Sequence, residues 1–69
     1  MLRFKPDGTG GFEVYDQGVW IGDLFEYDPD QWMFDWADDD GWLEGYEINA
    51  TSPAEAKRGV AAVVGDYGR

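Results

Sequence analysis

Residues 32–36 read WMFDW, and their aromatic side chains occupy every second position. Such alternation is typical of a β-strand, in which successive side chains point to opposite faces of the sheet. The flanking segments, DPDQ at residues 28–31 and ADDDG at residues 37–41, are rich in the residues that form turns. We therefore predict a strand at residues 32–36, with its even-numbered aromatic side chains on one face.

Three further segments show the same strand signals: FEVY (12–15), VWIGDLFEY (19–27) and WLEGYEI (42–48). The first two are joined by DQG at residues 16–18, a tight hairpin turn in which the glycine can adopt a positive φ. In the second segment we expect Trp20 and Leu24 to share one face. Residues 2–5 could add a short extra strand to what is otherwise an antiparallel meander of three or four strands.

The hydrophobic period changes near residue 50, where a helix is predicted. Ser52 suits the N-cap, Pro53 the first helical position and Glu55 the third, where its side chain would close a capping box. Beyond them, apolar residues recur at the spacing of one helix face: Ala56, Val60, Val63 and Val64. Gly65 fits the end of the helix. So short a helix needs the sheet for support, so we expect it to pack on one face and leave the other in water.

These elements predict an α+β fold in a single domain of 69 residues, with a lead-in at 1–11, the β-meander at 12–48 and the helix at 52–65. The chain has no cysteine and no histidine, so disulfides, thiolate metal sites and histidine-based catalysis are excluded. No apolar run has the length of a signal-peptide core or of a membrane span. We expect a cytoplasmic protein with no membrane contact, no metal and no cofactor.

The charge distribution is the strongest indication of function. Of the fifteen carboxylates, all except Asp66 lie between Pro6 and Ala56, a stretch without lysine or arginine. The five basic residues lie outside it: Arg3, Lys5, Lys57, Arg58 and Arg69. A surface of this composition repels nucleic acid and attracts basic proteins over a Debye length, about 10 Å at 0.1 M salt. We therefore expect a basic protein partner and no direct binding to nucleic acid.

Alternate residues of a strand lie about 6.6 Å apart on one face, which is close to the interval between successive phosphates of a nucleic-acid strand. We predict that carboxylates take the place of phosphates in the groove of a nucleic-acid-binding protein, with an exposed tryptophan as anchor. The predicted contact residues are the carboxylates Glu13, Asp23, Glu26, Asp28, Asp30, Asp35, Asp38, Asp39, Asp40, Glu44 and Glu47 and the aromatics Trp32, Trp36 and Trp42. We assign Trp20 and Phe34 to the core.

Two other kinds of site are weaker interpretations of the same residues. Residues 36–47 match a calcium-binding EF-hand loop at four positions, but Trp36 stands where the first ligand belongs and the flanks are predicted strands. Acidic pairs such as Asp28 and Asp30 could serve acid–base chemistry, yet the chain offers no histidine and no cysteine nucleophile. We therefore predict neither a metal site nor enzymatic activity.

In its size, its acidity, its lack of cysteine and its predicted sheet with one helix, the chain resembles the DNA-mimic inhibitors carried by bacteriophages. That class includes inhibitors of uracil-DNA glycosylase, anti-restriction proteins and some anti-CRISPR proteins. Its members share surface electrostatics and not a sequence motif, so the resemblance rests on the charge pattern from Asp7 to Glu55 and gives no role to an individual residue. It implies an inhibitor that occupies the nucleic-acid groove of a host defence or DNA-processing protein.

Two alternatives stay open at this point. The acidity could be an adaptation of a small protein to high salt, in which case the low lysine content belongs to the same adaptation. The chain could also be a regulatory subunit whose basic partner has nothing to do with nucleic acid. Both alternatives share the acidic surface and differ in what it contacts.

Overall fold

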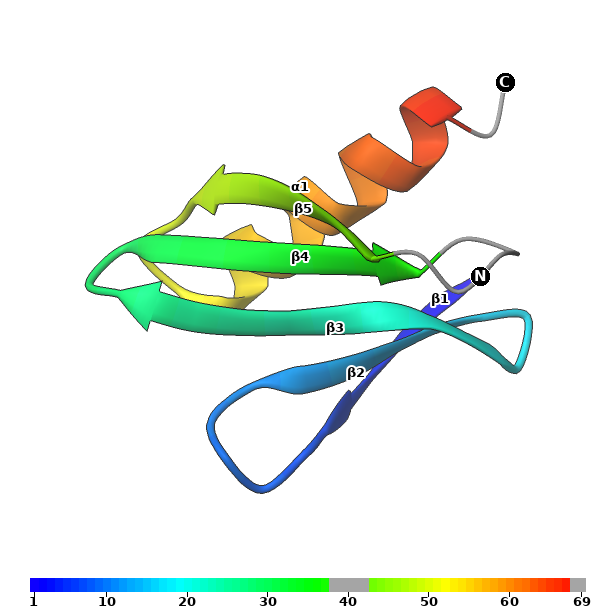
Figure 1. Ribbon diagram of the computed structural model, residues 1–69, viewed down its shortest axis with the longest axis horizontal. Coiled ribbons are helices and arrows are strands. Elements are labelled where there is room, and N and C mark those ends of the chain that lie inside the picture. The colour runs from blue at the N-terminus through cyan, green and yellow to red at the C-terminus, as the bar shows by residue number, and fades with distance from the viewer. Residues whose placement is uncertain (38–42, 68–69) are drawn as a thin grey trace.

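In the part of the chain that the structure describes, five strands form one antiparallel sheet in the order β1-β2-β3-β4-β5, and a helix packs against one of its faces (Figure 1). The computed structural model describes residues 1–37 and 43–67. The elements are β1 (Leu2–Pro6), β2 (Phe12–Asp16), β3 (Val19–Asp28), β4 (Gln31–Ala37), β5 (Leu43–Asn49) and α1 (Pro53–Tyr67). The predicted α+β meander with a C-terminal helix is confirmed. It has one strand more than the three or four expected, because the lead-in contributes β1.

Turn chemistry fixes the pairing of neighbouring strands. Between β2 and β3, Gln17 and Gly18 both have positive φ (52° and 83°), as in a type I′ hairpin turn, whose twist matches that of the strands. Between β3 and β4, Pro29 is followed by Asp30 at a φ of 59°, and the Glu26 carboxylate accepts a hydrogen bond from the Asp30 N–H (3.2 Å). Both turns lie where the sequence predicts them.

The core lies between the sheet and α1. Its buried side chains are those of Val14, Leu24, Trp32, Phe34, Ile48, Ala50, Ala56 and Val60. Phe34 is fully buried, as predicted, and lies opposite Leu24 on β3 and Tyr46 on β5. The even-numbered aromatic side chains of β4 therefore share one face, and this is the face that the helix covers.

A β-bulge in β3 removes Trp20 from the core. Val14 lies opposite Gly22 but Tyr15 lies opposite Trp20, so Ile21 is an extra residue in β3. The extra residue shifts the alternation by one position and turns Trp20 away from the helix, where 41% of its surface is exposed. The prediction that Trp20 packs in the core beside Leu24 is therefore wrong.

The start of α1 follows the predicted capping pattern in part. Ser52 Oγ accepts a hydrogen bond from the Glu55 N–H (3.2 Å), which is the N-cap interaction expected from the sequence. The Glu55 carboxylate reaches one residue further back than a capping box requires and accepts hydrogen bonds from the Thr51 N–H (3.2 Å) and hydroxyl (2.6 Å). The helix continues to Tyr67, so the prediction that it ends at Gly65 is wrong.

Candidate protein-binding surface

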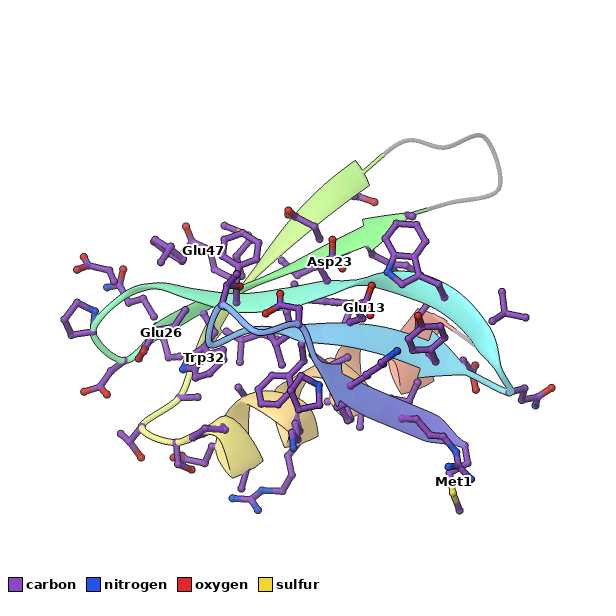
Figure 2. All side chains as sticks on the ribbon, turned by 90° about the horizontal axis from the view of Figure 1, so that it is seen from below. Met1, Glu13, Asp23, Glu26, Trp32 and Glu47 are labelled. Atoms are coloured by element: carbon purple, nitrogen blue, oxygen red, sulfur yellow. The ribbon has the colours of Figure 1, made fainter. Side chains whose placement is uncertain are left out.

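The sheet face away from α1, here called the open face, carries a row of residues that lie directly opposite one another across all five strands. The row is Lys5, Glu13, Asp23, Asp35 and Gly45. Its three middle residues, Glu13, Asp23 and Asp35, stand on neighbouring strands, and we call them the carboxylate row. Figure 2 shows Glu13, Asp23 and Glu47 on this side of the sheet and Trp32 on the side of the helix.

The carboxylate row opposes the stability of the fold. Directly opposite side chains in an antiparallel sheet have Cβ atoms about 4.5–5.5 Å apart, and like charges at that distance are destabilising. Asp23 Oδ1 accepts a hydrogen bond from Trp20 Nε1 (3.2 Å). Within residues 1–37 and 43–67, no group donates a hydrogen bond to the carboxylate of Glu13 or to that of Asp35. The fold therefore holds three carboxylates together without an evident structural use for two of them.

Other carboxylates do have structural tasks. Asp7 Oδ1 accepts hydrogen bonds from the hydroxyl and the N–H of Thr9 (2.7 and 2.8 Å), which hold the pKa of Asp7 below its ordinary value of 3.8. The hydroxyl and N–H of Thr51 likewise lower the pKa of Glu55 from 4.5. Asp16 Oδ1 lies 3.4 Å from the N-terminal ammonium. The carboxylate row differs from these groups, which stabilise a turn, the start of the helix and the chain terminus.

Aromatic and apolar side chains flank the carboxylate row. Trp20 and Tyr27 are 41% and 45% exposed, and the half-buried side chains of Phe25 and Met33 lie opposite each other on β3 and β4. Burial of the Tyr27 ring, followed by the charge of Glu47, raises the pKa of the Tyr27 phenol above 10.0. The phenol therefore stays neutral at physiological pH, close to the negative charge of Glu47. The open face thus combines negative charge with aromatic surface, a pairing found in protein interfaces.

Of the tryptophans that the sequence selected as anchors, neither Trp32 nor Trp36 lies on the open face. Trp32 is 3% exposed in the core, and its Nε1–H has no hydrogen-bond partner within the part of the chain that the structure describes. Trp36 is half-buried on the helix side, with its ring 5.9 Å from that of Phe34 and 6.0 Å from that of Tyr46. Trp42 lies outside the described residues. The prediction that Trp32 contacts a partner is therefore wrong, and among the tryptophans that the structure describes the exposed one is Trp20, which sequence reasoning missed.

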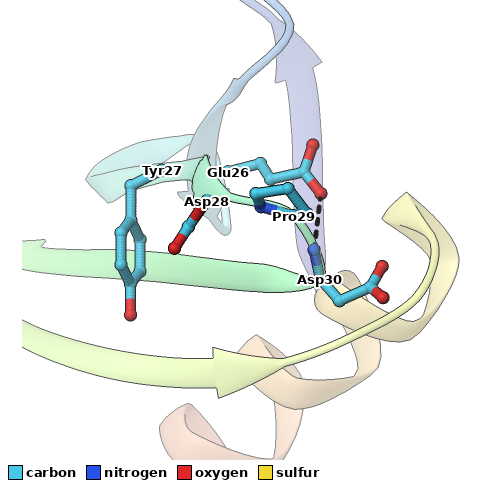
Figure 3. A pocket seen from close by; sticks show the side chains of 5 residues that line it. All are labelled: Glu26, Tyr27, Asp28, Pro29 and Asp30. Carbon is cyan, nitrogen blue, oxygen red and sulfur yellow. Dashed lines mark hydrogen bonds between the residues drawn. The ribbon is translucent and has the colours of Figure 1, made fainter.

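Three of the predicted contact carboxylates gather at the turn between β3 and β4, away from the carboxylate row. Glu26, Asp28 and Asp30, here called the turn cluster, line an open hollow of about 410 Å³ together with Tyr27 and Pro29 (Figure 3). Five consecutive residues form the whole lining, and it contains no cation. The hollow is a feature of the turn itself, and nothing in its geometry marks it as a catalytic pocket.

The remaining predicted carboxylates are divided between the two faces and the residues outside the described part. Glu47 lies on the open face, whereas Glu44 lies on the helix side of β5, where its carboxylate accepts a hydrogen bond from the Tyr46 hydroxyl (3.0 Å). Asp38, Asp39 and Asp40 lie outside the described residues. The open face therefore carries five of the eleven predicted carboxylates: Glu13, Asp23, Asp35 and Glu47, and at its end Asp28, which lies opposite Gln31.

The expected spacing of carboxylates along the strands is not found. On the open face β2, β4 and β5 each carry a single carboxylate, and on β3 the bulge at Tyr27 separates Asp23 from Asp28, which lies opposite Gln31 at the end of the strand. The charges line up across the strands instead, at intervals of about 4.8 Å and not the 6.6 Å of alternate residues along one strand. The register of the sheet, which sequence alone does not fix, decides this arrangement.

Within the described residues, no group of three or more carboxylates is arranged to hold a metal ion. The calcium-loop match at residues 36–47 falls partly outside the described part of the chain. No helix of the described structure is long and apolar enough to cross a membrane. The chain matches no protein-family model, no curated protein and no solved structure.

Proposed function

We propose that this protein binds, through its open face, the basic nucleic-acid groove of another protein and so prevents that protein from binding DNA or RNA. The observation that carries the proposal is the carboxylate row. Glu13, Asp23 and Asp35 stand directly opposite one another on three strands, where their mutual repulsion destabilises the fold. Residues that oppose stability in this way are typical of functional sites.

The row gives a physical reason for binding to a cationic groove. A lysine or arginine of the partner, placed between two of these carboxylates, replaces their repulsion by two attractions. Binding therefore gains from the release of repulsion that the free protein contains. The net charge of −10 adds long-range attraction, which speeds association and weakens with salt.

Trp20 and its aromatic neighbours supply the part of the interaction that salt does not screen. The indole N–H of Trp20 donates a hydrogen bond to Asp23, and 41% of the residue's surface remains exposed. An aromatic ring therefore lies beside the carboxylate row. Buried tryptophans are frequent among the residues that dominate the binding energy of protein interfaces. A standard interface covers roughly 800 Å² per partner, which is about a sixth of the 4790 Å² surface of this chain. One face of the sheet is a reasonable size for such a contact.

The site of action under this proposal is the cytoplasm, where a nucleic-acid-binding defence or DNA-processing protein would meet the inhibitor. No enzymatic step is proposed, because inhibition requires occupation of the groove alone. The inhibitor would be phage-encoded if it belongs with the DNA-mimic proteins that it resembles in charge.

A displacement experiment tests the proposal. A bacterial lysate is loaded on immobilised DNA, and the protein is added to elute the proteins whose grooves it occupies. We expect specific proteins to be displaced by the natural sequence. The row variant, with Glu13→Gln, Asp23→Asn and Asp35→Asn, should displace them much less.

The turn cluster provides the matched control. The variant with Glu26→Gln, Asp28→Asn and Asp30→Asn has the same net charge as the row variant but keeps the carboxylate row intact. It should displace nearly as much as the natural sequence. Equal losses in the two variants would show that total charge matters and the row does not. A protein that displaces nothing and unfolds below molar salt would instead be an acidic protein adapted to high salt.

A further inference from the structure

Within residues 1–37 and 43–67, no backbone group pairs with the outer edge of β5, so its backbone groups are available for pairing. The Ala50 N–H donates to the Asp30 carbonyl (3.2 Å), so these two opposed residues form a hydrogen-bonded pair. Such pairs alternate along an antiparallel ladder, and the β4–β5 register has no shift. The N–H and C=O groups of Gly45, Glu47 and Asn49 therefore point away from β4. All three residues are exposed, and β5 is the last strand of the sheet on this side.

The opposite edge of the sheet is protected against pairing and the β5 edge is not. β1 contains Pro6, which has no N–H, together with the basic residues Arg3 and Lys5. Proline and lysine are the usual means by which natural edge strands avoid additional pairing. β5 has no proline, lysine, arginine or bulge, and its charged residues are Glu44 and Glu47.

Strand β1 of this chain shows what kind of strand can pair with the edge of an acidic sheet. β1 reads Arg3-Phe4-Lys5 at its centre, and Lys5 lies opposite Glu13 of β2 on the open face. Phe4 lies opposite Val14 on the helix face and packs against the core. A basic–apolar–basic strand is thus already paired with the acidic sheet at one edge, with its cations toward the open face.

We propose that the β5 edge takes up an extended segment of the basic partner protein as a sixth, antiparallel strand of the sheet. The segment carries a basic residue opposite Glu47, an apolar residue opposite Tyr46 and a second basic residue opposite Gly45. A Cβ on Gly45 would lie 3.4 Å from Asp35 Oδ1 and 2.9 Å from Met33 Sδ, so the second basic residue can reach the Asp35 carboxylate beside the flexible Met33 side chain, which lies over Gly45. The pairing continues the open-face surface across the sheet edge. This inference rests on the proposed function, since it describes how the same partner is held.

A second copy of the chain fits the edge less well. Two β5 edges would place Glu44 and Glu47 of one copy against those of the other, and each chain has a net charge of −10. The β1 edge has suitable cations, but Pro6 removes one of its outward donors. A basic strand from another protein meets neither obstacle.

The test uses the full chain and a short capped peptide with Lys-Val-Arg at its centre. Hydrogen exchange followed by NMR should show the N–H groups of Gly45 and Glu47 slowed by about tenfold or more at saturating peptide. N-methylation of the peptide Lys or Arg, whose N–H groups face β5, should abolish this protection. N-methylation of the Val, whose N–H faces away, should leave it in place. A Glu-Val-Glu peptide should not bind.

Two variants of the protein give an independent readout. Glu47→Pro removes an outward N–H at an edge position that tolerates proline, whereas Glu47→Gln removes the same charge and keeps the N–H. The peptide should retain most of its affinity for the glutamine variant and lose it for the proline variant. Far-UV circular dichroism checks that both variants are folded, and if the proline variant is not, the N-methylated peptides decide.

Several outcomes would overturn the inference. Equal binding of all N-methylated peptides would mean that charge alone holds them, in which case the strand pairing is wrong while the displacement experiment still decides the proposed function. Absence of protection at Gly45 and Glu47 would also refute it. Sedimentation of the free chain as oligomers that protect the same amides would show that a second copy occupies the edge.

Discussion

Replacing the central carboxylate of the carboxylate row should make the protein more stable. Asp23 lies opposite Glu13 on one side and Asp35 on the other, so the change Asp23→Asn removes two like-charge contacts at once. Asparagine keeps a side-chain oxygen that can accept the hydrogen bond from Trp20 Nε1. The substitution therefore changes the charge and leaves the geometry of the row in place.

The size of the effect follows from the register. Cross-strand charged pairs are worth about 0.2–1 kcal/mol each, so the loss of two repulsions should raise the free energy of unfolding by about 0.4–2 kcal/mol. A domain of 69 residues is expected to have a total stability of roughly 3–10 kcal/mol. Each kcal/mol shifts the melting temperature of so small a domain by about 4–8 °C. The change should be measurable by either thermal or urea unfolding.

The dependence on salt concentration distinguishes charge repulsion from other causes of a gain in stability. The Debye length falls from about 30 Å at 0.01 M to about 3 Å at 1 M salt, which spans the distance between opposite side chains. The gain from Asp23→Asn should therefore be largest at low salt and shrink toward zero at 1 M. Asp28→Asn, which makes the same charge change away from the row, should have a much smaller effect. An Asp23→Asn protein no more stable than the natural one at low salt would refute the repulsion on which the account relies.

Two further predictions concern the helix. Gly59→Ala should destabilise the protein although alanine favours helices, because a Cβ there would lie 2.6 Å from Ile48 Cγ2; Gly65→Ala, where nothing lies within 4 Å, should stabilise it by up to about 1 kcal/mol. Urea unfolding of both variants measures the two changes in the free energy of unfolding. Changes of the same sign in both variants would contradict the close packing of α1 on β5. Because hydrogen bonds from Thr51 lower the pKa of Glu55 below 4.5 in the folded state, the stabilisation from its carboxylate should be fully present above that value and lost as the pH falls through the lowered pKa. The stability difference between the natural protein and Glu55→Gln should therefore disappear in acid, and a pH-independent difference would be evidence against it.

The elements of the fold could be predicted because they depend on local patterns. Period-two alternation identified the strands, turn residues identified the hairpins, and Ser52 identified the start of α1. The bulge at Ile21 leaves no such local signal, since the strand pattern continues through it. This one extra residue places Trp20 on the open face instead of the helix face. The sequence pattern therefore did not predict that Trp20 is exposed.

The carboxylate row could not be predicted for a related reason. Each of its members stands on a different strand, and their alignment depends on three registers at once. A slip of one residue in any strand would move its carboxylate to the helix face. The sequence therefore predicts an acidic surface, while the arrangement of charges on it follows from the pairing of the strands.

A competition assay measures whether this protein and DNA occupy the same groove of a partner. A protein displaced from immobilised DNA is purified, bound to fluorescently labelled DNA and titrated with this protein, while the anisotropy of the DNA and the mass of the complexes are followed. We expect mutually exclusive binding, with the DNA released in full and the row variant far less effective than the turn-cluster variant. A ternary complex, in which the partner holds its DNA and this protein together with no loss of affinity for either, would contradict it.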